Sequence, residues 1–126
     1  MSLETQFEET KPGYHEVQLS GRLDTTTYSG LEEQLKGLLQ GEAKALRIDM
    51  AKLDYISSMG LRVLLYAFKE LRKREAHLLM VNLQPQIQKV FDIAAALPPE
   101  TMFASVAEAD AYLDAMQRKV LEEGMG

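Results

Sequence analysis

The sequence predicts an α/β fold in which helices cover mainly one face of a mixed sheet of four to five strands. From residue 46 onward, short apolar strand patterns alternate with helix patterns, and this alternation requires parallel strands joined by right-handed crossovers. Before it, two strand patterns flank Lys11-Pro12-Gly13 and indicate an antiparallel hairpin. The predicted element order is therefore β-β-α-β-α-β-α-(β)-α.

The hairpin and the first helix come first in the chain. Apolar and polar residues alternate in 3–8 and 14–20, which is the pattern of strands with one buried face. Gly21-Arg22-Leu23-Asp24 ends the second strand, and the threonines at 25–27 are favourable helix starters. A helix to about Gln40 follows, because four leucines fall on one of its faces: Leu31, Leu35, Leu38 and Leu39.

A third strand is predicted over residues 46–50. Its apolar residues are separated by single polar ones, so one side points to the core and the other to solvent. A sheet with polar residues at alternate positions is typically covered by helices on one face only. The polar positions that we expect to meet water, in the second and third strands together, are Glu16, Gln18, Arg47 and Asp49.

The C-terminal half continues the alternation of strands and helices. Residues 77–83 form a nearly unbroken apolar run, which is typical of a central strand. Pro85 begins a helix that ends before Pro98-Pro99, and residues 102–104 are a short strand candidate. Ser105-Val106-Ala107-Glu108 is a capping box that opens a last helix. The predicted buried stripe of that helix is Val106, Ala109, Leu113, Met116 and Val120.

The stretch 53–61, Leu-Asp-Tyr-Ile-Ser-Ser-Met-Gly-Leu, joins the third strand to a helix-patterned run that ends near Arg74. Ser57 and Ser58 therefore lie where a helix begins. A serine at this position can cap the helix by accepting a hydrogen bond from a first-turn amide, which contributes about 1 kcal/mol. It can also accept a phosphate, because free amides and the positive end of the helix dipole favour an anion. Local chemistry alone favours the cap.

The composition limits the classes of protein. The 126 residues are 46% apolar and 26% charged with a net charge of −5, as in a globular domain. We expect one domain over residues 3–118, followed by a helix end and frayed tail over 119–126. The sequence has no long basic run, so we expect no direct binding to nucleic acid. No apolar stretch reaches the roughly 20 residues of a membrane span. Without a signal-peptide pattern, the expected location is cytoplasmic.

No catalytic constellation is visible in the sequence. The chain has no cysteine, which excludes thiolate nucleophiles and cysteine metal sites, and it lacks the common nucleotide-binding and hydrolase motifs. His15 and His77 begin predicted strands, whereas Ser57 and Ser58 follow the end of one, so the sheet should separate them. We therefore expect no enzyme, no cofactor and no metal site.

The residues around the central stretch resemble a STAS domain of the anti-anti-sigma factor type. The similarity is carried by Asp54 with the run Ser-Ser-Met-Gly-Leu-Arg-Val-Leu-Leu over 57–65, by the 21–24 corner and by the 105–109 box. It covers residues 3–118. The resemblance implies a protein that binds an anti-sigma factor, itself a serine kinase, and so releases a sigma factor. The kinase would phosphorylate this protein and eject it, and a serine phosphatase would reverse the change.

The resemblance also implies the site residues. The family's phosphoacceptor lies two residues before the glycine, which is Ser58; Ser57 stands where the best-known members have aspartate and is the alternative. Asp24 resembles the acidic residue near the acceptor, and it would either orient the serine hydroxyl or cap the next helix. Gly60 would let a partner approach closely. The expected partner-binding residues are Asp24, Ile56, Ser57, Met59 and Gly60.

A second reading keeps the fold without the switch. The chain would then be a STAS subunit of a lipid-transporting ABC system or of a signalling assembly, and Ser57 and Ser58 would act only at the helix start. The sequence does not specify an oligomeric state.

Overall fold

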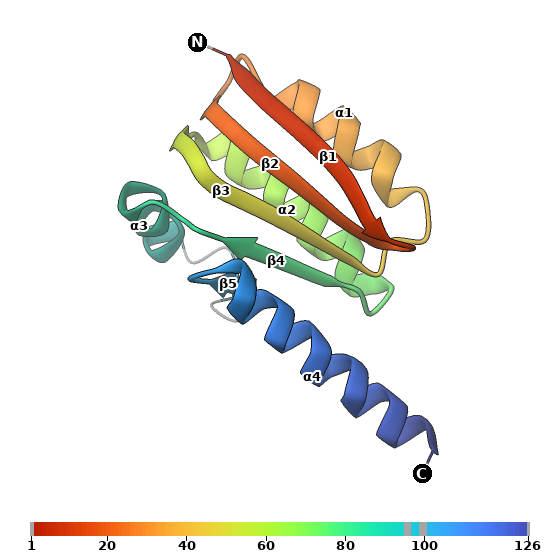
Figure 1. Cartoon of the computed structure of the whole chain (residues 1–126). Helices are drawn as coiled ribbons and strands as arrows, with labels where there is room; N and C mark the ends of the chain where they lie inside the picture. Colours follow the sequence, from red (N-terminus) through yellow and green to blue (C-terminus); the bar gives the residue numbers. More distant parts are fainter. Residues whose placement is uncertain (1, 95–96, 99–100, 126) are drawn as a thin grey trace.

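The computed structural model describes residues 2–94, 97–98 and 101–125, apart from the side chains of residues 117 and 120–125. Figure 1 shows one five-stranded sheet in the order β1-β2-β3-β4-β5. β1 is antiparallel to β2, and every later pair is parallel. The predicted mixed sheet and element order are therefore confirmed. The strands are β1 (Leu3–Lys11), β2 (Tyr14–Leu23), β3 (Ala45–Ile56), β4 (His77–Val81) and β5 (Met102–Phe103).

Several strand ends differ from the sequence prediction: β1 continues to Lys11 instead of residue 8, β5 stops at Phe103 instead of residue 104, and β3 and β4 differ as well. The prediction that the third strand stops at residue 50 is wrong, because β3 continues to Ile56 opposite Leu23 of β2. The β2–β3 pairing contains two register shifts and continues to the ends of both strands. Leu53 and Ile56, in this last part of β3, are buried. β4 ends at Val81 rather than residue 83, because Asn82 has a left-handed φ of 59° that no strand continues.

Three helices lie on one face of the sheet and enclose the main core. They are α1 (Tyr28–Leu39), α2 (Ser58–Lys73) and α3 (Pro85–Ala94). Inward-facing strand residues such as Val17, Ile48 and Met80 pack against leucines of α1 and α2 and against Phe91 of α3. The predicted helix end at Pro98-Pro99 falls partly outside the described residues.

The fourth helix, α4 (Val106–Met125), lies on the opposite face of the sheet, against β4 and β5 (Figure 1). Ser105 caps its start as predicted, because the Ser105 Oγ accepts a hydrogen bond from the Glu108 N–H at 3.2 Å. The Glu108 carboxylate accepts the Ala104 N–H at 2.9 Å, one residue before the N–H that a capping box uses. The side chain of Val120 is outside the described set, and the frayed tail stays a prediction. Helices mainly on one face are confirmed.

α4 changes the environment of part of the polar sheet face. Arg47 of β3 is paired both with Glu16 of β2 and with Asp110 of α4. The Glu16 and Arg47 side chains are only 13% and 18% exposed, so the expectation that these two meet water freely is wrong. The sequence pattern could not show this, because Asp110 lies 63 residues after Arg47. None of the helices in the described ranges is both long and apolar enough to cross a membrane.

Candidate functional site

The junction between β3 and α2 is built around Ser57. Ser57 is the N-cap of α2 with an extended backbone, and its Oγ accepts a hydrogen bond from the Gly60 N–H at 3.2 Å. Its N–H donates to the Leu23 carbonyl at 2.8 Å, and its own carbonyl accepts from the Leu61 N–H at 2.9 Å. The Ser57 N–H therefore holds the helix start against the end of β2, while its Oγ and carbonyl close the first turn of α2.

Ser58 is the first residue of α2 and is exposed. Within the described residues its hydroxyl forms no hydrogen bond, and the first turn of α2 carries no acidic side chain. The N–H groups of Ser58 and Met59 likewise have no hydrogen-bond partner in that part of the chain. The positive end of the helix is thus open to solvent next to a free hydroxyl, an arrangement that accommodates an added anion.

Two of the predicted partner-binding residues lie inside the domain. The Ile56 side chain is 4% exposed and belongs to the main core. Gly60 is buried against Leu23: a Cβ built on Gly60 would meet the Leu23 Cγ at 2.6 Å. The expectation that Gly60 is an approach point for a partner is therefore wrong. Its missing side chain lets α2 approach β2, and Ile56 anchors the same junction from β3.

Asp24 shapes the turn before α1. Its Oδ1 accepts hydrogen bonds from the Thr26 N–H at 2.9 Å and the Thr26 hydroxyl at 2.7 Å. These bonds, with smaller contributions from Thr27 and Arg22, hold the pKa of the Asp24 carboxyl below its usual value. It forms no hydrogen bond with Ser57 or Ser58. Of the two alternatives, the structure favours the role at the helix start, with Thr27 as the formal N-cap.

Arg22 and Tyr55 flank the same junction and were missed in the sequence. The Arg22 guanidinium lies over the Tyr55 ring at 4.1 Å from its centroid, and Arg22 Nε is 3.5 Å from Asp24 Oδ2. Tyr55 is 42% exposed, so the stacked pair lies on the surface. Both residues lie in quoted motifs, at the 21–24 corner and in the central stretch. Only the β2–β3 register, which pairs Arg22 with Tyr55, shows that they meet.

The histidines lie at the other end of the sheet, as predicted. His15 is the second residue of β2 and His77 is the first residue of β4, whereas Ser57 follows the end of β3. The His77 ring packs edge-on against Tyr112 of α4, with ring centroids 5.7 Å apart. Burial at this contact lowers the pKa of His77. No group of acidic or histidine side chains in the described ranges is arranged to hold a metal ion.

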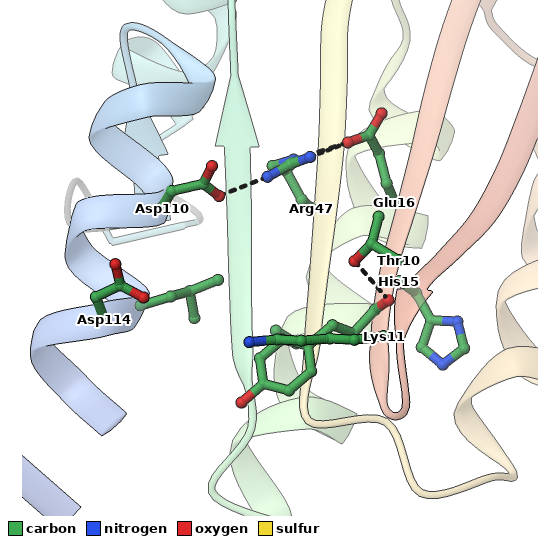
Figure 2. Close-up of a pocket in the computed structure, with 10 residues that line it drawn as sticks. Thr10, Lys11, His15, Glu16, Arg47, Asp110 and Asp114 are labelled. Carbon is green, nitrogen blue, oxygen red and sulfur yellow. Dashed lines mark hydrogen bonds and ion pairs between the residues drawn. The ribbon is translucent and has the colours of Figure 1, made fainter. Parts of the chain in front are cut away.

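A separate pocket of about 280 Å³ lies between α4 and the starts of β2 and β3 (Figure 2). In Figure 2, Arg47 bridges from Glu16 to Asp110, Lys11 and Asp114 lie farther down the opening, and the His15 ring points away from it. Lys11 Nζ is 4.3 Å from the centre of the Tyr14 ring. The Arg47 charge is neutralised by its two partners, so these groups act chiefly to fasten α4 to the sheet.

Comparison with known proteins gives consistent results. The family model described as "STAS domain" matches residues 8–109. BtrV of Bordetella bronchiseptica, a proposed anti-sigma factor antagonist, is 34% identical over 79 residues, which are 63% of this chain and 68% of BtrV. The anti-sigma-B factor antagonist of Listeria monocytogenes is 29% identical over 93 residues, covering 74% of this chain and 82% of that protein.

A solved structure supports the fold. The Bacillus cell fate determinant SpoIIAA in its phosphorylated form superposes with a TM-score of 0.72 at 20% identity, over 87% of this chain and 99% of SpoIIAA. At this level of identity, the likeness bears on the fold alone. The family match, over residues 8–109, spans from β1 to the first turn of α4.

Proposed function

The chain belongs to the STAS domain family, and we propose that it is an anti-sigma factor antagonist. In this proposal it binds an anti-sigma serine kinase, is released when that kinase phosphorylates Ser58, and is restored by a serine phosphatase. It regulates sigma-factor-dependent transcription through protein contacts in the cytoplasm, without catalysis of its own. Residues 3–118 form the unit that carries this function.

The observation that carries the proposal is the division of roles between the two serines. Ser57 is committed to the cap through its Oγ, whereas the neighbouring Ser58 hydroxyl is exposed and forms no hydrogen bond with a described residue. A kinase can therefore phosphorylate Ser58 without breaking the hydrogen bonds that hold the start of α2. This favours Ser58 over Ser57 as the phosphoacceptor, because phosphorylation of Ser57 would disrupt the cap.

The switch follows from charge and solvation. A phosphate adds a charge of about −1.5 to −2 at pH 7. The open N-terminus of α2 tolerates this charge, so the domain itself should change little. A partner surface packed over Met59 and Tyr55 would instead have to remove the dianion from water, which is costly unless the charge is paired. The phosphorylated protein therefore does not stay bound to its partner.

We propose a partner surface that differs in part from the sequence expectation. Ser57, Ser58 and Met59 form its centre, and Asp24 lies beside it at the end of β2. Arg22 and Tyr55 are added, because their stacked side chains are exposed beside the junction. Ile56 and Gly60 support this surface from the interior.

A kinase assay tests the proposal. The protein is incubated with its cognate anti-sigma kinase and ATP, and the modified residue is mapped by mass spectrometry. We expect one phosphate on wild type and on Ser57→Ala, and none on Ser58→Ala. Phosphate on Ser57 in the wild type would reverse the assignment, and failure of the kinase to bind or modify the protein would refute the function.

Two aspartate variants separate the switch from a general charge effect. Ser58→Asp places a permanent negative charge at the exposed position, and we expect it to weaken kinase binding. Ser57→Asp adds the same charge one residue earlier, where the carboxylate can turn inward to cap the helix, and should weaken binding less than Ser58→Asp does. Equal affinity of wild type and Ser58→Asp would contradict the mechanism.

A further inference from the structure

A groove of about 770 Å³ between α2 and α3 has no role in the proposed switch. Its apolar lining comes from both helices, the segment after α3 and β5: Leu65, Phe68, Phe91, Leu97, Pro98 and Met102. Lys69 and Arg72 of α2 also line it. The groove therefore combines an apolar floor with two cationic side chains on one edge.

No ion pair with a described residue neutralises the positive charge of this edge. Lys69 forms no ion pair within the described residues, and Arg72 contacts only the Phe68 ring, at 5.8 Å from its centroid. Asp92 of α3 is the acidic side chain on the opposite edge, and its Oδ1 accepts a hydrogen bond from Gln88. An uncompensated positive edge on a chain of net charge −5 favours an acidic partner at this site.

The same face of α2 leads from the groove to Ser58. Residues 58, 62, 65, 69 and 72 are spaced by four and three positions, so they form one stripe along the helix. Arg62 adds a third exposed cation to this stripe. At 1.5 Å per residue, Lys69 lies about 16 Å from Ser58 along the helix axis. A protein that covers Ser58 can reach the groove without leaving this face.

We infer that the groove between α2 and α3 binds an amphipathic helix with an acidic edge, contributed by a partner protein. An apolar lining beside exposed cationic side chains suits the helix-in-groove mode, in which apolar residues at i, i+3, i+4 and i+7 enter the groove. The groove is a half-open depression, whereas sites for small ligands usually enclose most of the ligand. This inference concerns a second contact surface and does not depend on phosphorylation of Ser58.

Nuclear magnetic resonance with synthetic peptides tests the inference on the full, ¹⁵N-labelled chain. One helical peptide carries leucines at i, i+3, i+4 and i+7 with flanking glutamates, and a second replaces the glutamates by lysines. We expect the glutamate peptide to shift the amide signals of Leu65, Phe68 and Met102 and to bind about tenfold more tightly than the lysine peptide. The difference should shrink as salt is added.

A pair of charge reversals localises the effect. Lys69→Glu with Arg72→Glu should abolish the preference for the glutamate peptide. Arg118→Glu with Lys119→Glu makes the same charge change at exposed positions of α4 and should leave the preference intact. Equal binding of both peptides, or shifts elsewhere on the protein, would overturn the inference.

Dodecanoate, a fatty acid with a negative charge, tests whether the groove binds an acidic lipid in place of a helix. If it shifts the same signals at lower concentration than the glutamate peptide, the groove is a site for an acidic lipid and the inference is wrong. Because no kinase enters these titrations, their outcome is independent of the test of the switch at Ser58.

Discussion

Gly60 in the first turn of α2 lies directly against Leu23 at the end of β2. A Cβ on Gly60 would meet the Leu23 Cγ at 2.6 Å and the Leu23 carbonyl oxygen at 3.0 Å. The same carbonyl accepts the Ser57 N–H, so one residue of β2 fixes both the cap and the first turn of the helix. This contact sets how far Ser58 projects from the sheet.

Gly60→Ala should therefore destabilise the domain. The added methyl group forces Leu23 or the helix to move, and overpacking of this kind costs about 1–3 kcal/mol. Gly37→Ala is the matched control, because the Gly37 position in α1 has open space and should gain up to about 1 kcal/mol from alanine's helix propensity. Urea unfolding of both variants measures the difference. A neutral Gly60→Ala would mean that the contact with Leu23 is not restrictive.

Alanine at the two serines should separate the cap from the exposed hydroxyl. Ser57→Ala removes the acceptor for the Gly60 N–H and should lower the free energy of unfolding by about 1 kcal/mol. Ser58→Ala removes an exposed hydroxyl without a hydrogen bond to any described residue and should stay within about 0.5 kcal/mol of wild type. Chemical denaturation compares the two. Equal losses would show that Ser58 also holds the helix start.

A negative charge at position 58 should leave the fold intact. Ser58→Asp places a carboxylate at the N-terminus of α2, where no acidic residue occupies the first turn, and should raise the free energy of unfolding by about 0.3–1 kcal/mol at low salt. Thermal unfolding at low and high salt checks the sign and its screening. A clear loss of stability would show that weaker kinase binding by this variant reflects unfolding.

The pairing that fastens α4 to the sheet should be measurable. Arg47→Met leaves the mostly buried Glu16 carboxylate without its partner and should cost about 1–3 kcal/mol. Asp110→Asn removes the exposed end of the same pairing, with an Asp110 side chain that is 57% exposed, and should cost less than about 1 kcal/mol. Urea unfolding of both variants checks the order. A larger loss for Asp110→Asn would contradict it.

His77 should make stability depend on pH. Its pKa in the folded protein is lowered from 6.5, so the unfolded chain binds the proton more readily. The free energy of unfolding should therefore fall as the pH drops below about 6.5, and this decrease should level off below the folded-state pKa. Unfolding curves of wild type and His77→Gln between pH 7.5 and 5.5 measure the contribution, with His15→Gln as a control for the other histidine. An identical pH dependence of wild type and His77→Gln would refute it.

Local patterns explain which features could be read from the sequence. Alternation in β2, leucine spacing in α1 and the cap at Ser105 each depend on neighbours within a few residues, and each agrees with the structure. The first strand of the hairpin is different: β1 has no buried residue, and Phe7 is 37% exposed. The sequence pattern places the end of β3 too early, because the last residues of β3 pair with β2. Ile56 pairs with Leu23, which lies more than thirty residues earlier in the chain. Pairing across the sheet is not visible in a local pattern.

The candidate site divides in the same way. The sequence by itself determined that two serines begin a helix after a strand, because hydrophobic period and cap chemistry are local properties. Only the tertiary structure decided which hydroxyl is used for the cap, that Gly60 faces Leu23 instead of a partner, and that Arg22 stacks on Tyr55. These relations arise where β2, β3 and α2 meet, and close packing between segments distant in sequence depends on distances that no local pattern specifies.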